Sequence, residues 1–276
     1  MVVRGDRLPG GRDRGSAQRF DGDREAQASA SAAATTSVDV SDLREEPRGR
    51  ARRGQDGLTP EAAESTFDGG SISLALADTR GVSWLVKLDR FGGPQWQEEV
   101  GCFNLPPDSF ADGVSVQQTA DGGYVVGGGT IGCGSSTVCP LLSGIQCALV
   151  ERLDATGGLV WARVYSTGAT STAINRIRQT SDGGFIAVGS AQNDRIGALI
   201  LKLDSSGNVQ WQRQLGPAGT TSAYLNDVQQ TADGAFVATG EFEMPSGDLP
   251  RTSVLVRQGR PERQRPLAAG FQQPGR

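Results

Sequence analysis

The stretch Gln179-Thr180-Ser181-Asp182-Gly183-Gly184-Phe185-Ile186-Ala187-Val188-Gly189 decides how this chain folds, because it occurs three times in lightly altered form. The other two copies are residues 118–128 and 230–240. Each copy places Asp-Gly between two runs of strand-forming residues, and this dipeptide is a strong short-range signal for a hairpin. We therefore expect a β-hairpin at each copy, closed by a type I′ turn whose central residues have positive φ.

A second pattern follows each hairpin. In residues 198–204, alternation with a period of two places Leu199, Leu201 and Leu203 on one face of a strand. A tight Asp-x-x-Gly turn comes next, with the glycine in the left-handed region. In the strand after it, the same alternation predicts that Val209 and Trp211 share one face.

This second half, Leu-Asp-x-x-Gly-x-x-x-Trp, recurs at residues 88–96, 153–161 and 203–211, with an insert from about residue 131 to 146. A degenerate copy of the Asp-Gly-Gly hairpin motif occupies residues 67–72. One unit is thus four strands in ~50 residues, which is typical of propeller blades. We predict an all-β fold, a β-propeller-like array of about three and a half four-stranded blades. Such an incomplete ring leaves exposed strand edges and needs missing blades or self-association.

The repeats divide the chain into three parts. Residues 1–65 are rich in arginine, glycine and alanine without strand or helix periodicity, so we expect disorder, including the basic run 48–53. Residues 66–256 hold the β-propeller-like repeats. Residues 257–276 lack the half-blade that the pattern requires, and a one-nucleotide shift at codon 257 is compatible with restoring it. We hypothesise that this tail is non-native or disordered, the product of a frameshift.

Composition excludes several function classes. The chain has no histidine, which rules out histidine-based triads and histidine metal sites. A net charge of −4 gives no support for nucleic-acid binding. No signal-peptide core and no run of ~18 apolar residues is visible, so no transmembrane segment is expected. Lysine occurs only at Lys87 and Lys202, which we attribute to the composition of the coding sequence.

The two repeated halves together resemble a class of secreted bacterial and archaeal β-propeller repeat proteins, most of them uncharacterised. This resemblance covers about two-thirds of the chain and implies an extracellular, periplasmic or cell-surface location. The Leu-Asp-x-x-Gly-x-x-x-Trp half is also similar to the tryptophan-docking repeat of pyrroloquinoline-quinone propellers. We expect its tryptophans to pack between adjacent blades rather than to contact a cofactor, and we predict no cofactor.

The four cysteines, Cys102, Cys133, Cys139 and Cys147, all belong to the second blade or its approach. In a four-stranded blade their positions fall on one face, and the exported family implies an oxidising compartment. Two disulfides are therefore favoured, and we prefer Cys133–Cys139 with Cys102–Cys147 among the three pairings. A zinc site is the alternative, but the short knuckle spacing typical of such sites is missing.

The repeated aspartates also permit two interpretations. Calcium requires several oxygen ligands that converge on one point. These aspartates occur one per turn on separate blades, so we expect them to serve turn formation. They are Asp89, Asp121, Asp154, Asp182, Asp204 and Asp233.

These features favour a non-enzymatic exported scaffold or binding module, with an unknown protein or glycan as its ligand. The alternative is a fragment of a quinoprotein-like or glycan-acting propeller enzyme, and a third hypothesis is an assembly scaffold that pairs peptides through strand edges. Binding is expected on the face with irregular loops, because those loops vary while the opposite turns stay uniform. The candidate binding residues there are Phe103, Asn104, Asp108, Asn193, Asp194, Glu241 and Glu243.

Overall fold

The computed structural model describes residues 3–5, 36–39, 58–77, 82–101, 110–131, 145–192, 196–215, 222–243 and 251–256. Every regular element in these ranges is a β-strand, which confirms the all-β prediction. The tail 257–276 lies outside the described residues, so the frameshift hypothesis stays a prediction.

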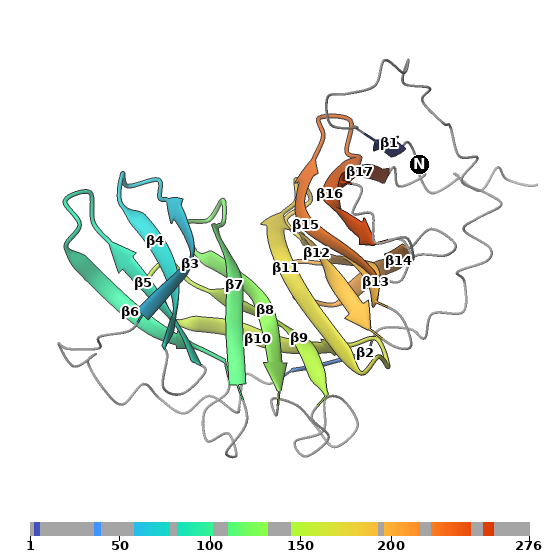
Figure 1. The fold of residues 1–276 in the computed structure, drawn as a ribbon. Helices are drawn as coiled ribbons and strands as arrows, with labels where there is room; N and C mark the ends of the chain where they lie inside the picture. The colour runs from blue at the N-terminus through green and yellow to red at the C-terminus, as the bar shows by residue number, and fades with distance from the viewer. Residues whose placement is uncertain are drawn as a thin grey trace, which may run out of the picture.

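Most strands belong to antiparallel meanders that follow one another in an arc, which does not close into a ring within the described strands (Figure 1). The first three meanders have four strands each, and the fourth has three. The first consists of β3 (Leu58–Ser65), β4 (Ser71–Ala77), β5 (Val82–Leu88) and β6 (Pro94–Val100). The second consists of β7 (Phe110–Gln118), β8 (Tyr124–Ile131), β9 (Gln146–Leu153) and β10 (Leu159–Ser166). The third consists of β11 (Ser171–Gln179), β12 (Phe185–Gln192), β13 (Ile196–Leu203) and β14 (Val209–Leu215). The fourth consists of β15 (Ser222–Gln230), β16 (Phe236–Glu243) and β17 (Arg251–Val256).

Two further strands come from the N-terminal segment. Strand β1 (Val3–Gly5) pairs with β17, and β2 (Thr36–Asp39) pairs with β10, both antiparallel. The edge of the fourth meander is therefore covered by a strand from the start of the chain. This arrangement contradicts uniform disorder before residue 66.

The start of the repeats at residue 66 was also wrong, because β3 begins at Leu58 and pairs with β4 over its whole length. The sequence of β3 has low strand propensity and includes Pro60, so local preference alone does not reveal it. A register shift between Pro60 and Ala62 forms a bulge, a position where proline and its missing N–H are tolerated. Pairing with an established neighbour outweighs propensity here.

The same bulge recurs at one place in the first strand of every meander. The register shifts lie between Pro60 and Ala62, Gly113 and Ser115, Ile174 and Arg176, and Leu225 and Asp227. Because a bulge bends its strand and re-aims the side chains after it, it provides a common reference point for comparing the four repeats.

The hairpin turns were correctly placed, but the predicted turn type was wrong. In the second meander, Gly122 N donates to Thr119 O at 2.8 Å and Thr119 N donates to Gly123 O at 2.8 Å. The central turn residues are therefore Ala120 and Asp121, followed by Gly122 with φ of 88°. This is the three-residue hairpin loop in which a turn is followed by a left-handed glycine. Residue 119 begins the turn because its hydroxyl bonds the Asp121 carboxylate at 2.6 Å.

A second bulge corrects the expected orientation of the fourth strand. Lys202 pairs with Trp211 and Leu203 with Val209, which leaves Gln210 as the extra residue. Val209 consequently packs against the core between the second and third meanders, whereas Trp211 packs against the core between the third and fourth. The two side chains were expected to share a face and do not.

The hydrophobic core lies between meanders. One buried cluster joins the first and second, another the second and third, and a third cluster the third and fourth. Leu199, Leu201 and Leu203 all face the second of these clusters, as the alternation predicts. Full burial of one such side chain contributes ~1.5–3 kcal/mol, so each meander is stabilised chiefly by its neighbours.

Candidate functional site

The tryptophans of the repeat hold adjacent meanders together. Trp161 lies edge-on to Phe185 of the next meander, with ring centroids 5.9 Å apart, and its Nε1 donates to Ser205 O at 3.2 Å. Trp96 with Tyr124, and Trp211 with Phe236, repeat this contact at centroid distances of 5.3 and 5.9 Å. The expectation that tryptophan packs between blades is confirmed by these contacts.

The glutamine that opens each hairpin motif has a structural role in the opposite direction. Gln179 Oε1 accepts a hydrogen bond from Ala120 N at 2.8 Å, in the turn of the preceding meander. Gln118 accepts from Phe67 N at 2.7 Å and Gln230 from Ser181 N at 2.8 Å. Each pair of adjacent meanders is thus joined by a tryptophan from the earlier one and a glutamine from the later one.

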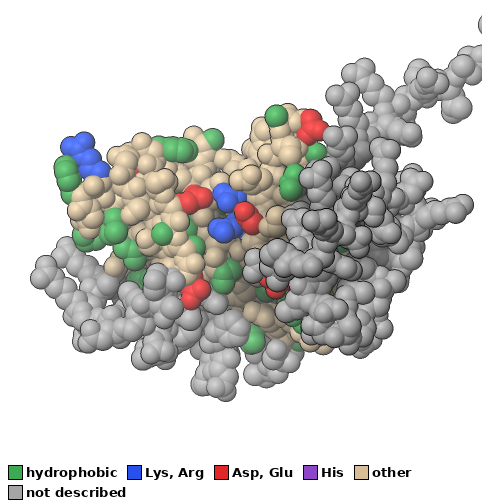
Figure 2. All heavy atoms as spheres, turned by 45° about the horizontal axis from the view of Figure 1, so that its top comes forward, with side chains coloured by type: hydrophobic (Ala, Val, Ile, Leu, Met, Phe, Trp, Pro, Cys, Tyr) green, Lys and Arg blue, Asp and Glu red, His purple; other side chains and the backbone are tan. Residues whose placement is uncertain are grey.

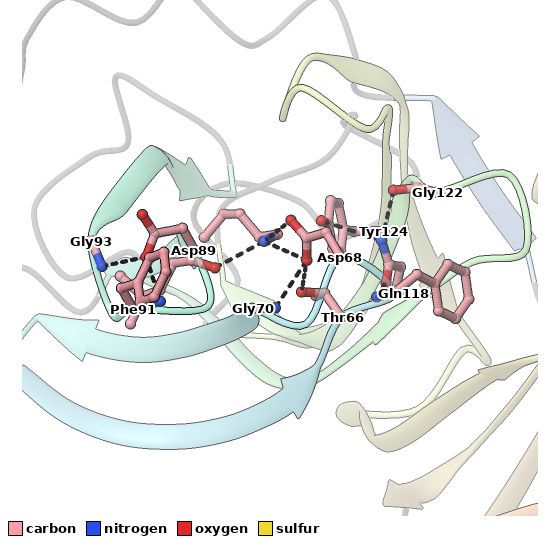
Figure 3. Close-up of polar contacts among 12 residues, drawn as sticks. Thr66, Asp68, Gly70, Asp89, Phe91, Gly93, Gln118, Gly122 and Tyr124 are labelled. Carbon is pink, nitrogen blue, oxygen red and sulfur yellow. Dashed lines mark hydrogen bonds and ion pairs between the residues drawn. The ribbon is translucent and has the colours of Figure 1, made fainter.

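The motif aspartate holds a buried cation from the third strand of its own meander (Figure 3). Asp68 accepts hydrogen bonds from the Thr66 hydroxyl at 2.5 Å, from Gly70 N at 3.1 Å and from Lys87 Nζ at 2.8 Å. The Lys87 side chain is only 3% exposed, and its ammonium also donates to Leu88 O at 2.8 Å. This ammonium, together with the hydroxyl and the amide, holds the pKa of Asp68 well below its usual range.

The second and third meanders repeat this arrangement. Arg152 donates to Asp121 at 2.6 Å, and Lys202 lies 2.9 Å from Asp182. The Thr119 hydroxyl is the main cause of the lowered pKa of Asp121. Burial alone would raise the pKa of Asp182, but hydrogen bonds from Thr180 and Lys202 outweigh it and lower the pKa. The two lysines of the chain are therefore structural, and attributing them to coding composition missed their role.

The aspartates of the second turn organise that turn. Asp89 Oδ1 accepts from Phe91 N and from Gly93 N, both at 2.8 Å, and Asp154 and Asp204 do the same in their own turns. Turn chemistry therefore accounts for them, as expected. In the part of the chain that the structure describes, no group of three or more acidic, histidine or cysteine residues is arranged to hold a metal ion.

Function must therefore be sought where the repeats differ. Counted from the shared bulge, the first strands β3, β7, β11 and β15 carry two positions at which the charge of the side chain varies between repeats. The first position holds Ala62, Ser115, Arg176 and Asp227, and the second holds Glu64, Gln117, Arg178 and Gln229.

Four of these side chains meet across three meanders and form the inner-strand cluster: Glu64, Arg176, Arg178 and Asp227. Arg178 Nη1 lies 3.5 Å from Glu64 Oε1, and its Nη2 lies 3.5 Å from Asp227 Oδ1. Arg176 Nε lies 3.3 Å from the same Asp227 oxygen. The side chains are 24–43% exposed. Figure 2 shows basic and acidic side chains side by side near the middle of the face that it draws.

These contacts differ in kind from the turn ion pairs. Charge-assisted hydrogen bonds of good geometry measure ~2.7–2.9 Å, and the turn pairs have this length. The inner-strand contacts are longer, and Arg176 Nε and Arg178 Nε are buried without a hydrogen-bond partner. Polar groups surround the cluster, since Gln118 N donates to Glu64 at 3.3 Å and Asn175 Nδ2 donates to Leu225 O at 2.9 Å. The cluster therefore contains both hydrogen-bond donors and hydrogen-bond acceptors.

The sequence-predicted binding residues are not brought together in the described structure. Glu241 is half-buried in β16, and Glu243 ends that strand. The other five lie outside the described residues, and their role stays a prediction: Phe103, Asn104, Asp108, Asn193 and Asp194.

Only one cysteine can be placed. Cys147 is fully buried in β9, in the cluster that also contains Val100 of the first meander. Cys102, Cys133 and Cys139 lie outside the described residues. The preferred pairing therefore stays a prediction.

Sequence reasoning missed the whole inner-strand cluster. Glu64 falls in the segment expected to be disordered, and Arg176, Arg178 and Asp227 belong to no motif. Alignment of the three first strands that the repeat reveals, with a search for charged residues at positions that the repeat does not conserve within the chain, would have identified Arg176, Arg178 and Asp227.

Comparisons with known proteins give little beyond the strand content. No known family and no curated protein matches the chain. A xylan β-1,4-xylosidase from Bacillus halodurans C-125 is similar to 76% of this chain over 43% of its own length, with 13% identity and a TM-score of 0.40. The tail fiber of Staphylococcus aureus phage P68 is similar to 75% of this chain over 51% of its length, with 7% identity and a TM-score of 0.27. The chain thus spans about half or less of these proteins, and the scores are too low to carry an argument. No helix among the described residues is long and apolar enough to cross a membrane.

Proposed function

We propose that this chain is a non-enzymatic binding module of β-propeller type, in which each meander is one blade and the inner-strand cluster binds the ligand. The proposal includes export to an oxidising compartment, in which pairs among the four cysteines form disulfides. On this proposal the array of about three and a half blades is extended by missing blades or by a second copy.

The observation that carries the proposal is that residues shared by the repeats and residues that differ between them make different kinds of contact. The motif glutamine, aspartate, lysine and tryptophan are all engaged in turns or in contacts between meanders. The inner-strand cluster also links meanders, but through longer contacts between residues that the repeat does not share, and it gathers charges from β3, β11 and β15 at one place. Charged side chains held together on rigid strands are well suited to bind a ligand.

A glycan-acting enzyme is the second candidate, because Glu64 and Asp227 both contact Arg178. Glycoside hydrolysis uses two carboxyl groups, one of them as an acid that protonates the leaving group. Here both carboxylates serve as ion-pair partners of a single guanidinium, which favours binding over catalysis. Release of reducing sugar that is lost in both the Glu64→Gln and the Asp227→Asn variants would support the enzyme.

The binding function can be tested without knowledge of the ligand. We would screen the full chain by thermal shift against a mixed panel of oligosaccharides, peptides and small organic acids, with the Arg178→Gln and Asp227→Asn variants in parallel. The proposal expects at least one compound whose stabilising effect disappears in both variants. If every stabilising compound acts equally on both variants, the inner-strand cluster is not the binding site.

A further inference from the structure

The inner-strand cluster has a charge pattern that restricts its ligand. Its members form one chain of contacts, Glu64 to Arg178 to Asp227 to Arg176, in which the sign alternates at every step. The four charges sum to zero. An added anion would lie near Glu64 or Asp227, and an added cation would lie near an arginine. A ligand with one strong charge therefore meets repulsion as well as attraction wherever it binds.

The hydrogen-bonding capacity of the cluster is only partly used. Among the described residues, the guanidinium of Arg178 makes one hydrogen bond, to Glu64, and that of Arg176 makes none. A guanidinium carries five N–H donors. On the acceptor side, Asp227 Oδ1 accepts from Val228 N at 2.9 Å, and Glu64 Oε2 accepts from Gln118 N at 3.3 Å. The Nε atoms of both arginines are buried, so the donors that a ligand can reach are the terminal Nη groups, which lie next to the carboxylate acceptors.

Resting on the proposed binding function, we propose that the inner-strand cluster binds a neutral, polyhydroxylated ligand, a glycan without charged substituents. A hydroxyl group is both donor and acceptor, so neighbouring hydroxyls of one sugar can donate to a carboxylate and accept from an arginine together. Such a ligand adds hydrogen bonds without breaking the alternating ion pairs. The contacts of 3.3–3.5 Å within the cluster are longer than charge-assisted hydrogen bonds of good geometry.

The test is isothermal titration calorimetry of the full chain against three kinds of probe. The first is a set of neutral hexasaccharides of glucose, xylose, mannose and N-acetylglucosamine. The second is a sulfated hexasaccharide, and the third is pentalysine. Each binding probe is titrated again into Arg178→Gln and into the matched control Arg90→Gln, which changes an exposed arginine in a turn of the first meander.

We expect at least one neutral hexasaccharide to bind, with affinity at least about tenfold lower in Arg178→Gln and unchanged in Arg90→Gln. Circular dichroism checks that each variant folds, and Glu64→Gln replaces Arg178→Gln if that variant does not. If only the sulfated sugar or pentalysine binds in an Arg178-dependent way, the ligand class is wrong while the binding function stands. If neutral sugars bind equally to Arg178→Gln, or if none binds, the inference is overturned. The broader thermal-shift panel then decides whether the binding function falls with it.

Discussion

Replacement of either partner in the ion pair between Lys202 and Asp182 should lower the free energy of unfolding, but by unequal amounts. The Lys202 side chain is 3% exposed, and its ammonium contacts Asp182 at 2.9 and 3.1 Å and Leu203 O at 3.0 Å. Asp182→Asn keeps an oxygen for Thr180 and Gly184 but leaves the ammonium buried without a counter-charge. Removal of one partner of a fully buried pair costs ~3–5 kcal/mol. Because the Asp182 side chain is 52% exposed and water screens the pair, we expect about 2 kcal/mol.

Lys202→Met should cost less, about 0.5–1 kcal/mol. Methionine fills the space of the lysine stem, and Asp182 keeps its hydrogen bonds from Thr180 and Gly184 as well as its contact with water. The double variant should then be more stable than Asp182→Asn alone, because it contains no uncompensated charge. Urea unfolding followed by tryptophan fluorescence gives the three free energies of unfolding. A larger loss for Lys202→Met than for Asp182→Asn, or a double variant as unstable as the sum, would refute this account of the turn.

Further predictions concern the contacts between meanders, the turns and the cysteines. Trp161→Phe should lower the free energy of unfolding by about 1–2 kcal/mol, since it loses the bond to Ser205 O and part of the buried ring; the exposed Phe91→Ala in the same assay should change it by less than about 0.5 kcal/mol. Gly184→Ala should cost about 1–3 kcal/mol, because its Cβ would lie 2.3 Å from Leu203 O, and an unchanged urea midpoint would contradict this. The turn aspartates have lowered pKa values when folded, so their stabilisation is present above the unfolded pKa of about 3.9 and is lost as the pH falls through the folded values; the thermal midpoint should hold from pH 7 to 5 and drop below about pH 4, less steeply in Lys202→Met. Peptide mapping without reductant should recover a Cys102–Cys147 link, and a Cys147 peptide joined to Cys133 or Cys139 would show a different pairing.

The strands and their pairing partners could be predicted from the sequence because the residues that recur in the repeat are those whose side chains pack together. The tryptophan and the aromatic residue that it meets, such as Trp161 and Phe185, stand at fixed places in the motif, and they come into contact where adjacent meanders pack together. The role of Lys202 did not follow, because a lysine in a strand ordinarily lies in solvent. Its burial depends on a carboxylate that approaches from the neighbouring hairpin.

Two other predictions, the turn type and the orientation of Val209, were wrong for local reasons. The type I′ turn was expected from Asp-Gly alone, but the threonine hydroxyl bonds the aspartate and moves the start of the turn by one residue. The orientation of Val209 failed because alternation assumes an unbroken period of two, and the bulge at Gln210 breaks it. The inner-strand cluster was not predictable from any single repeat, since it exists only where β3, β11 and β15 come together.

The central claim is that repeated residues maintain the fold while the inner-strand cluster is free to serve binding. The most direct test replaces all four cluster members by neutral polar residues, Glu64→Gln, Arg176→Gln, Arg178→Gln and Asp227→Asn together, which leaves the net charge unchanged. The free energy of unfolding of this variant is then compared with that of the unmodified chain and of Asp182→Asn. We predict a change of less than about 1 kcal/mol for the four-site variant, as for exposed ion pairs, against about 2 kcal/mol for Asp182→Asn. A four-site variant that loses as much stability as Asp182→Asn would show that the cluster holds the fold together, and would contradict the claim.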